Sequence, residues 1–319
     1  MIMVNIQKAA IIGCGFVGTA TAFSLMHKGI FSELVLLDAN HKKAEGEAMD
    51  LSHGRPFSHT MKIYAGDYSD LGDCALIIIT AGANQKPEEK RLELVHRNVE
   101  VFRNIIPQIT AQQFEGILLI VTNPVDILTC VALELSGYPK ERVIGSGTVL
   151  DSARFRYLLG EHLKVDSRSV HAMIIGEHGD SELAVWSGAN VSGIAIPDFC
   201  EIQGFQDHGE ETDRIYRQVR DSAYKIIERK GATYYGVAMA VSRIAQAIVK
   251  NEHSVLPISS LMEGEYGLER LCISVPTIVG RRGAEKVLEI PLDGEERDRL
   301  RVSAEEISEV LKETGFQSV

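Results

Sequence analysis

A glycine-rich turn constrains this chain more than any other stretch of its sequence. Residues 8–12 form a short apolar run that predicts a buried strand, and the turn that follows has glycine at Gly13, Gly15 and Gly18. A helical pattern comes next, and a second predicted strand ends at Asp38, about 20 residues past the last glycine. Strand, glycine turn, helix, strand and acid in this order are the dinucleotide-binding fingerprint. The glycines permit the tight turn, the approach of the backbone to a pyrophosphate and close helix–strand packing.

The acid at Asp38 indicates which dinucleotide binds. Its carboxylate would accept hydrogen bonds from the ribose hydroxyls and repel a 2′-phosphate, and the next residues, Ala39 and Asn40, offer no arginine to that phosphate. We therefore expect NAD and not NADP. The residues expected to contact the cofactor are Gly13, Gly15, Phe16, Val17, Gly18, Asp38, Gly82, Ala83, Val121 and Asn123.

Strand and helix patterns alternate through the first half of the 319 residues. This alternation predicts an α/β fold with a doubly wound parallel sheet of the Rossmann type. The second half is less regular, so we expect an NAD-binding domain over residues 1–145 and an α+β substrate domain over residues 146–319, with the site in the crevice between them.

Composition excludes several classes of partner. The net charge of −11 argues against nucleic acid and anionic membranes, which both attract basic surfaces. Residues 9–26 carry no charge, but their glycines and hydroxyl side chains make them a poor membrane span. The cysteines are few and scattered, which predicts reduced thiols in the cytosol and neither disulfides nor a structural zinc site. They are Cys14, Cys74, Cys130, Cys200 and Cys272.

Candidate catalytic residues lie in the stretch 146–181. Asp151 and Arg154 are three apart on a predicted helix, so they share one face and can act at a common point. His178 follows in a Gly-Glu-His-Gly-Asp turn. A carboxylate, a guanidinium and an imidazole suit proton transfer to an anionic substrate, although the trio alone also fits a surface ion pair and a loop histidine.

Five motifs in order remove that ambiguity. They read GCGFVG, ITAGANQKPEEKR, VTNPVDIL, GSGTVLDSARFR and IIGEHGDSE, and they include Arg91 and Asn123 beside the trio. Over essentially its whole length the chain resembles the L-lactate/malate dehydrogenase family.

The resemblance implies a role for each residue. His178 would exchange a proton with the substrate oxygen, and Asp151 would fix its tautomer and favour its charged form. Arg154 would hold the substrate carboxylate through two parallel hydrogen bonds, and Arg91, on a closing loop, would polarise the carbonyl. Hydride comes from the cofactor, and no metal is needed.

Charge counting selects the substrate within the family. Asn123 and Thr233 would line the pocket, while Gln85 stands where members that act on malate have an arginine. A second substrate carboxylate would then be buried without a cation, which favours pyruvate and L-lactate. A malate dehydrogenase remains the alternative enzyme, and an NAD(H)-binding redox sensor the non-enzymatic alternative.

The resemblance also suggests regulation. Arg156 lies about 200° around the helix from Arg154, so it cannot serve the same pocket. Arg156 and His171 match the positions at which many bacterial members bind fructose 1,6-bisphosphate between subunits. We therefore expect a homotetramer activated by this sugar bisphosphate.

Overall fold

The computed structural model describes residues 4–83, 91–205 and 208–316. The strands of its main sheet are β1 (Asn5–Ile12), β2 (Glu33–Leu37), β3 (Lys62–Ala65), β4 (Cys74–Ile79), β5 (Ile117–Ile120), β6 (Val143–Gly145), β12 (Ser254–Glu263), β13 (Glu269–Gly280) and β14 (Gly283–Val287). The short strands elsewhere are β7 (Val170–His171), β8 (Ile174–Ile175), β9 (Leu183–Ala184), β10 (Asn190–Val191) and β11 (Ile194–Ala195). The helices are α1 (Phe16–Lys28), α2 (His41–Gly54), α3 (Arg91–Thr110), α4 (Val125–Ser136), α5 (Val149–Leu163), α6 (Ile196–Gln203), α7 (His208–Lys230), α8 (Tyr235–Val249) and α9 (Gly294–Glu313).

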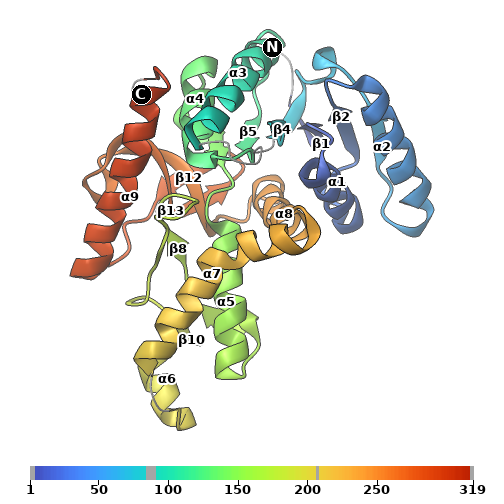
Figure 1. Cartoon of the computed structure of the whole chain (residues 1–319). Helices are drawn as coiled ribbons and strands as arrows, with labels where there is room; N and C mark the ends of the chain where they lie inside the picture. Colours follow the sequence, from blue (N-terminus) through green and yellow to red (C-terminus); the bar gives the residue numbers. More distant parts are fainter. Residues whose placement is uncertain (1–3, 84–90, 206–207, 317–319) are drawn as a thin grey trace.

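The predicted doubly wound sheet is confirmed. Its strands run in the order β3-β2-β1-β4-β5-β6, and all of these neighbours are parallel (Figure 1). The chain order reverses between β1 and β4, and ligands of such sheets bind at the carboxyl ends of the strands at this switch point. The glycine turn after β1 and the predicted contacts Gly82 and Ala83 after β4 therefore lie on either side of the binding crevice.

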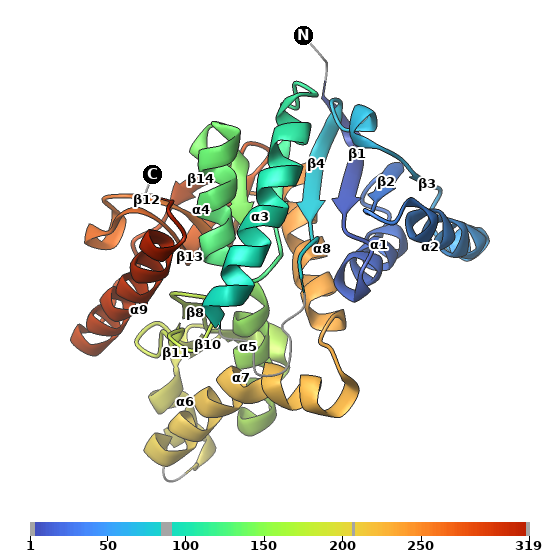
Figure 2. The same ribbon diagram turned by 45° about the horizontal axis from the view of Figure 1, so that its top comes forward.

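Helices cover both faces of the sheet, which explains why its strands are apolar at nearly every position. Side chains alternate along β1, where Ala10 and Ile12 pack in one core and Ala9 and Ile11 in the other. The helices α3, α4 and α9 cover the first face, and α1, α2 and α8 cover the second (Figure 2). The apolar face of α3 is buried against the first face of the sheet, with Val95 and Phe102 inaccessible to solvent.

The main sheet continues into the second half of the chain. The antiparallel strands β12 and β13 pair over most of their length, and β12 pairs with β6 through Ser259 and Gly145. The helix α8 packs on α1. The NAD-binding half and the second half therefore share one sheet and one core, which fixes their relative position.

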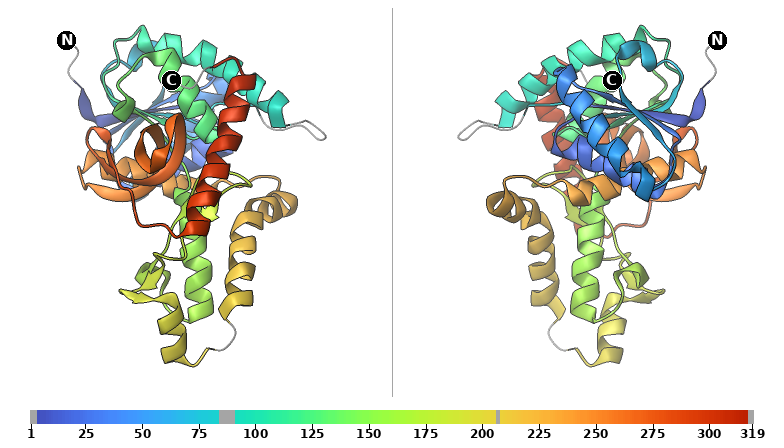
Figure 3. Two further views of the ribbon diagram at one scale, coloured as in Figure 1. Left: turned by 90° about the vertical axis from the view of Figure 1, so that its left-hand side faces the viewer. Right: turned by 90° about the vertical axis from the view of Figure 1, so that its right-hand side faces the viewer.

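A separate lobe projects from the sheet and contains α5, α6 and α7 with β7, β10 and β11 (Figure 3). It has its own core, in which Phe155 and Leu159 of α5 pack against Val170, Phe199 and Val219. None of the described helices combines the length and the apolar character that a membrane crossing demands.

Candidate active site

The first turn of α5 is fixed to the strand that leads to His178. The Thr148 hydroxyl donates to the Ile174 carbonyl (2.6 Å). The Ser152 hydroxyl accepts from the Ile174 N–H (2.9 Å) and donates to its carbonyl (3.2 Å). These contacts link the start of α5 to β8, so the segment that leads to His178 is held beside the helix that carries Asp151.

Three different elements hold the turn that ends at His178. The Gly176 N–H donates to the Ser274 carbonyl of β13 (2.8 Å), and the Glu177 N–H donates to the Ser303 hydroxyl of α9 (2.8 Å). The His178 N–H donates to the Asp126 carboxylate of α4 (2.7 Å). Gly176 has a φ of 95°, which favours glycine. The position of the histidine is thus determined by both halves of the chain.

The predicted trio is assembled as expected. The Asp151 carboxylate bridges its partners, since Oδ2 lies 2.6 Å from Nδ1 of His178 and Oδ1 accepts from the Arg154 guanidinium (2.8 Å). The Asp151 side chain is 3% exposed, that of Arg154 14% and that of His178 23%. Because Nδ1 faces Asp151, the other ring nitrogen, Nε2, is left to exchange a proton with a substrate.

Electrostatics favour the charged form of the histidine. Burial disfavours the imidazolium, but the charge and hydrogen bond of Asp151 outweigh burial and raise the pKa of His178 to about 9. Burial likewise opposes the Asp151 carboxylate, yet His178 and Arg154 hold the pKa of Asp151 below its usual range. At neutral pH the pair is therefore an imidazolium and a carboxylate. The imidazolium of His178 has a proton to donate, and the Arg154 guanidinium beside the pair can bind an anion.

Asp151, His178 and Glu182 are also the group of described residues whose ligand atoms lie close enough together, within 4.8 Å, to hold a metal ion. Asp151 and His178 already pair with each other in this group. The expectation that the chemistry needs no metal stays a prediction.

The glycine turn fits a dinucleotide. A Cβ on Gly13 would lie 2.5 Å from the Ala81 nitrogen, and one on Gly18 would lie 1.9 Å from the Gly13 carbonyl, so both positions require glycine. A Cβ on Gly15 would meet nothing within 4 Å, which leaves open space at the N-terminus of α1. The N-cap residue, Gly15, has no side chain to cap that helix end, so the N–H groups there can bind phosphate. Asp38 lies against the turn, where its carboxylate accepts from the Cys14 N–H (2.8 Å).

Two buried polar residues that the sequence analysis did not assign connect these parts. The Asn98 amide accepts from the Ala83 N–H (2.7 Å) and donates to the Asn123 carbonyl (2.8 Å), so it ties the ends of β4 and β5 together. Asp126 accepts the His178 N–H and also the Ser274 hydroxyl (3.0 Å). The signal for both was a polar residue on an apolar helix face, which a buried hydrogen bond explains.

The other predicted residues are distributed as follows. Asn123 is exposed at the end of β5, three residues before Asp126, and Val121 is buried beside it. Thr233 is partly buried between α7 and α8, and the neighbouring Tyr234 stacks on Phe16 at the start of α1 (5.3 Å between ring centroids). Val17 packs against the core beneath α1.

Two further predicted residues, Gln85 and Arg91, come after β4 in the sequence. Gln85 lies outside the described residues. Arg91, which we placed in the loop, is the first residue of α3. The helical pattern of α3 therefore starts one residue earlier than its apolar face indicated.

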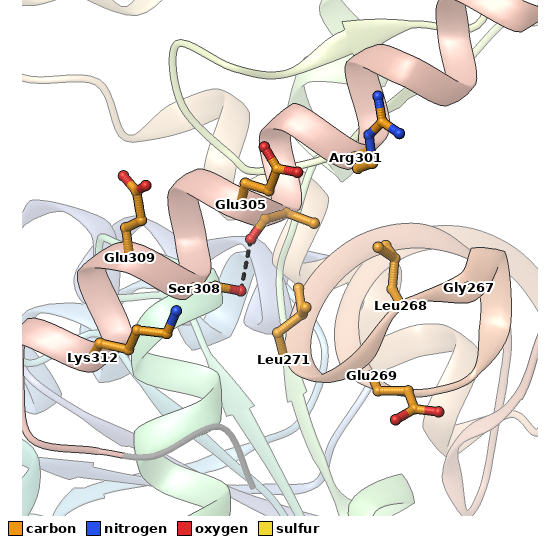
Figure 4. Close-up of a pocket in the computed structure, with 10 residues that line it drawn as sticks. Gly267, Leu268, Glu269, Leu271, Arg301, Glu305, Ser308, Glu309 and Lys312 are labelled. Carbon is orange, nitrogen blue, oxygen red and sulfur yellow. Dashed lines mark hydrogen bonds between the residues drawn. The ribbon is translucent and has the colours of Figure 1, made fainter.

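One pocket lies away from this site, between α9 and the start of β13 (Figure 4). The charged groups at its rim are mixed in sign, with Glu305 and Glu309 close to Arg301 and Lys312. None of the described residues that the sequence assigned to the site lines it.

Comparison with known proteins places this geometry in a family. The chain matches the model of the lactate/malate dehydrogenase NAD-binding domain over residues 7–145 and that of the alpha/beta C-terminal domain over residues 148–317. It is 55% identical to an L-lactate dehydrogenase of Acetivibrio thermocellus, over 96% of this chain and 97% of that one.

Solved structures agree. A lactate dehydrogenase from a Medee basin deep-sea metagenome library superposes with a TM-score of 0.94 at 45% identity, over 98% of this chain and 100% of that one. The minor L-lactate dehydrogenase of Enterococcus mundtii, in a ligand-bound form, gives a TM-score of 0.93 at 42% identity, over 96% and 98% of the two chains.

Proposed function

The chain belongs to the lactate/malate dehydrogenase family, and we propose that it is the enzyme that reduces pyruvate to L-lactate with NADH and catalyses the reverse reaction. NAD is the cofactor of this family's NAD-binding domain. The observation that carries the proposal is the buried pair of Asp151 and His178 with Arg154 on the same carboxylate. Such a pair can donate a proton to a small 2-oxo acid, and the neighbouring Arg154 guanidinium can bind the carboxylate of that acid.

In this mechanism the cofactor supplies the hydride, and the chain supplies charge and orientation. Arg154 binds the substrate carboxylate, which places the keto carbon beside the crevice at the switch point. Nε2 of His178 gives its proton to the oxygen that becomes the lactate hydroxyl, while Asp151 keeps Nδ1 protonated. In the reverse direction the neutral imidazole takes that proton back, and Asp151 stabilises the resulting cation. We assign to Arg91 the polarisation of the carbonyl.

Pyruvate is favoured over oxaloacetate because the sequence is neutral at Gln85. Oxaloacetate would bring a second carboxylate, and burial of an unpaired carboxylate costs several kcal/mol. Asn123 and Thr233 complete the proposed pocket.

The test is an NADH oxidation assay with a panel of 2-oxo acids that includes pyruvate and oxaloacetate. We expect the highest kcat/KM with pyruvate, and loss of most of the activity in His178→Asn, which keeps a polar side chain but cannot transfer the proton. Faster turnover of oxaloacetate would make the chain a malate dehydrogenase. NADH binding without turnover of any 2-oxo acid would support the redox sensor.

We also propose activation by fructose 1,6-bisphosphate. Arg156 lies on α5, which packs against β7, and β7 carries the exposed His171. The Nε of Arg156 is buried and has no hydrogen-bond partner among the described residues, so its N–H group lacks an acceptor there. Exposed apolar side chains on α1, α7 and α8, such as Phe23, Tyr224 and Met239, support a homotetramer.

Two measurements test this regulation. Millimolar fructose 1,6-bisphosphate should lower the KM for pyruvate at neutral pH, and Arg156→Gln should abolish that response without loss of the basal rate. Light scattering should give the tetramer mass. Unchanged pyruvate saturation curves in the wild type would exclude the effector.

The reaction would regenerate NAD⁺ from NADH, and we expect it in the cytoplasm. All five cysteines are described, and each is buried and unpaired, in keeping with a reducing compartment.

A further inference from the structure

Glu182 has a buried carboxyl group beside the catalytic pair. Its side-chain oxygen lies within 4.8 Å of ligand atoms of both Asp151 and His178, and the residue is 3% exposed. Its Oε1 has no hydrogen-bond partner among the described residues. Buried polar groups are almost always hydrogen-bonded, so an unpaired carboxyl at this depth needs a physical reason.

The backbone of Glu182 is held firmly although its carboxyl is not. The Tyr216 hydroxyl of α7 donates a short hydrogen bond to the Glu182 carbonyl, and Arg299 of α9 donates to the same carbonyl (3.5 Å). Arg299 also donates to the Tyr216 hydroxyl (2.7 Å). Two helices therefore fix where residue 182 lies, so the position of its carboxyl beside the pair is built into the fold.

Charged and titratable groups on four helices surround Glu182 and His178. They are Asp151 and Arg154 on α5, Tyr216 and Arg220 on α7, Arg299 on α9 and Asp126 on α4. The Asp151 carboxylate already accepts from Arg154 and pairs with His178, and the Asp126 carboxylate accepts from the His178 N–H. The Glu182 carboxyl also lies near the imidazole, and its Oε1 has no hydrogen-bond partner among the described residues.

We propose that Glu182 acts through His178 as a positioning residue, and that its carboxylate stabilises the imidazolium so that the catalytic acid keeps its proton at alkaline pH. The proposal rests on the proposed function only for its kinetic readout. Two carboxylates, those of Asp151 and Glu182, would then keep the proton on His178.

The environment of the Glu182 carboxyl supports this role. Burial raises the pKa of Glu182 to about 8, and the pKa of His178 is raised to about 9, with the Glu182 charge among the causes. The raised pKa lowers the cost of burying Glu182 near neutral pH, and the carboxylate that forms at alkaline pH lies beside the imidazolium.

Glu182→Gln tests the proposal because glutamine keeps the shape and removes the charge. An opposite charge at this distance shifts a pKa by about one unit or more. In the protein without ligands, NMR titration of ¹³C-labelled histidines should therefore show the His178 transition at a pH about one unit lower than in the wild type. His178→Asn identifies that signal among the ten histidines. The alkaline fall of kcat/KM for pyruvate should move by the same amount.

Glu296→Gln is the matched control. Glu296 is also buried, but it caps α9 and accepts from Ser187, and no hydrogen bond or ion pair among the described residues links it to the pair. Its loss should lower stability and leave the His178 transition unchanged. Glu182→Asp, which keeps the charge, should retain most of the wild-type transition even if its rate falls.

A folded Glu182→Gln protein with the wild-type His178 transition would overturn the inference. So would Glu182→Asp with the same lowered transition as Glu182→Gln, because the effect would then follow shape and not charge. Neither result touches the proposed function, which fails instead if the wild type does not reduce pyruvate.

Discussion

Replacement of Asp151 by asparagine removes the charge that holds the proton of His178. Asparagine keeps the size of the side chain, and its amide oxygen can still accept a hydrogen bond from Nδ1. It cannot compensate the imidazolium, which would remain buried with Arg154 nearby and no counter-ion on α5. We therefore expect the pKa of His178 to fall to about its ordinary value, because Asp151 opposes burial most strongly and Glu182 and Asp126 oppose it less.

The size of the effect follows from the pKa of His178, which is raised from 6.5 to about 9. That difference corresponds to roughly 3 kcal/mol in favour of the charged form. At pH 7.5 a group with a pKa near 9 is almost fully protonated, whereas one with a pKa of about 6.5 is about one-tenth protonated. Loss of the proton alone should thus reduce kcat/KM for pyruvate at least about tenfold at pH 7.5.

The assay is the pH profile of both directions. In the wild type, pyruvate reduction needs the imidazolium and should fall as pH rises through about 9, whereas lactate oxidation needs the neutral ring and should rise there. In Asp151→Asn both transitions should move to about pH 6.5, the ordinary value for histidine, and pyruvate reduction should recover partly at pH 5.5. Asp198→Asn, at an exposed site on α6, is the control. If Asp151→Asn retains a transition near pH 9, the charge argument is wrong.

The remaining predictions concern the nucleotide half. Gly18→Ala places a Cβ against the Gly13 carbonyl, so calorimetry should show a loss of about 1–3 kcal/mol in the free energy of unfolding, whereas Gly46→Ala, in open space within α2, should gain roughly 0.5–1 kcal/mol. Equal effects would refute the packing argument. Asn98→Ala breaks the link between the ends of β4 and β5, and fluorescence titration should show weaker NADH binding, by about tenfold for a lost buried hydrogen bond. Asn104→Ala, an exposed site on α3, should bind NADH normally.

The parallel sheet was predictable because its determinants are local. A strand buried on both faces reads as a continuous apolar run, and the glycine turn marks where the first one ends. The apolar face of α3 and the pairing of β12 with β13 follow from patterns of the same kind. The catalytic trio was predictable for another reason, since Asp151 and Arg154 are neighbours on one helix and the motifs supplied the partner at residue 178.

The supports of the site could not be predicted in the same way. Asp126 and His178 are 52 residues apart, and Glu177 and Ser303 are 126 apart, so their contacts depend on how the halves pack. Asn98 was recognisable only as a polar residue on an apolar helix face, and the sequence did not indicate that Ala83 and Asn123 are its hydrogen-bond partners. The pairing of β12 with β6 could not be predicted either, because the residue pattern of a buried strand does not specify which strand lies beside it.

The positions of these supports separate two functions within the site. We assign acid–base chemistry to His178, whose turn is held by α4, α9 and β13, all parts of the shared core. We assign the choice between one and two substrate carboxylates to Gln85, which lies outside the described residues. We predict that a substitution at Gln85 changes which anion is accepted and leaves the imidazolium and its carboxylates as they are. Substrate preference can therefore diverge within this fold without cost to the catalytic proton, which fits a family whose members act on lactate and on malate.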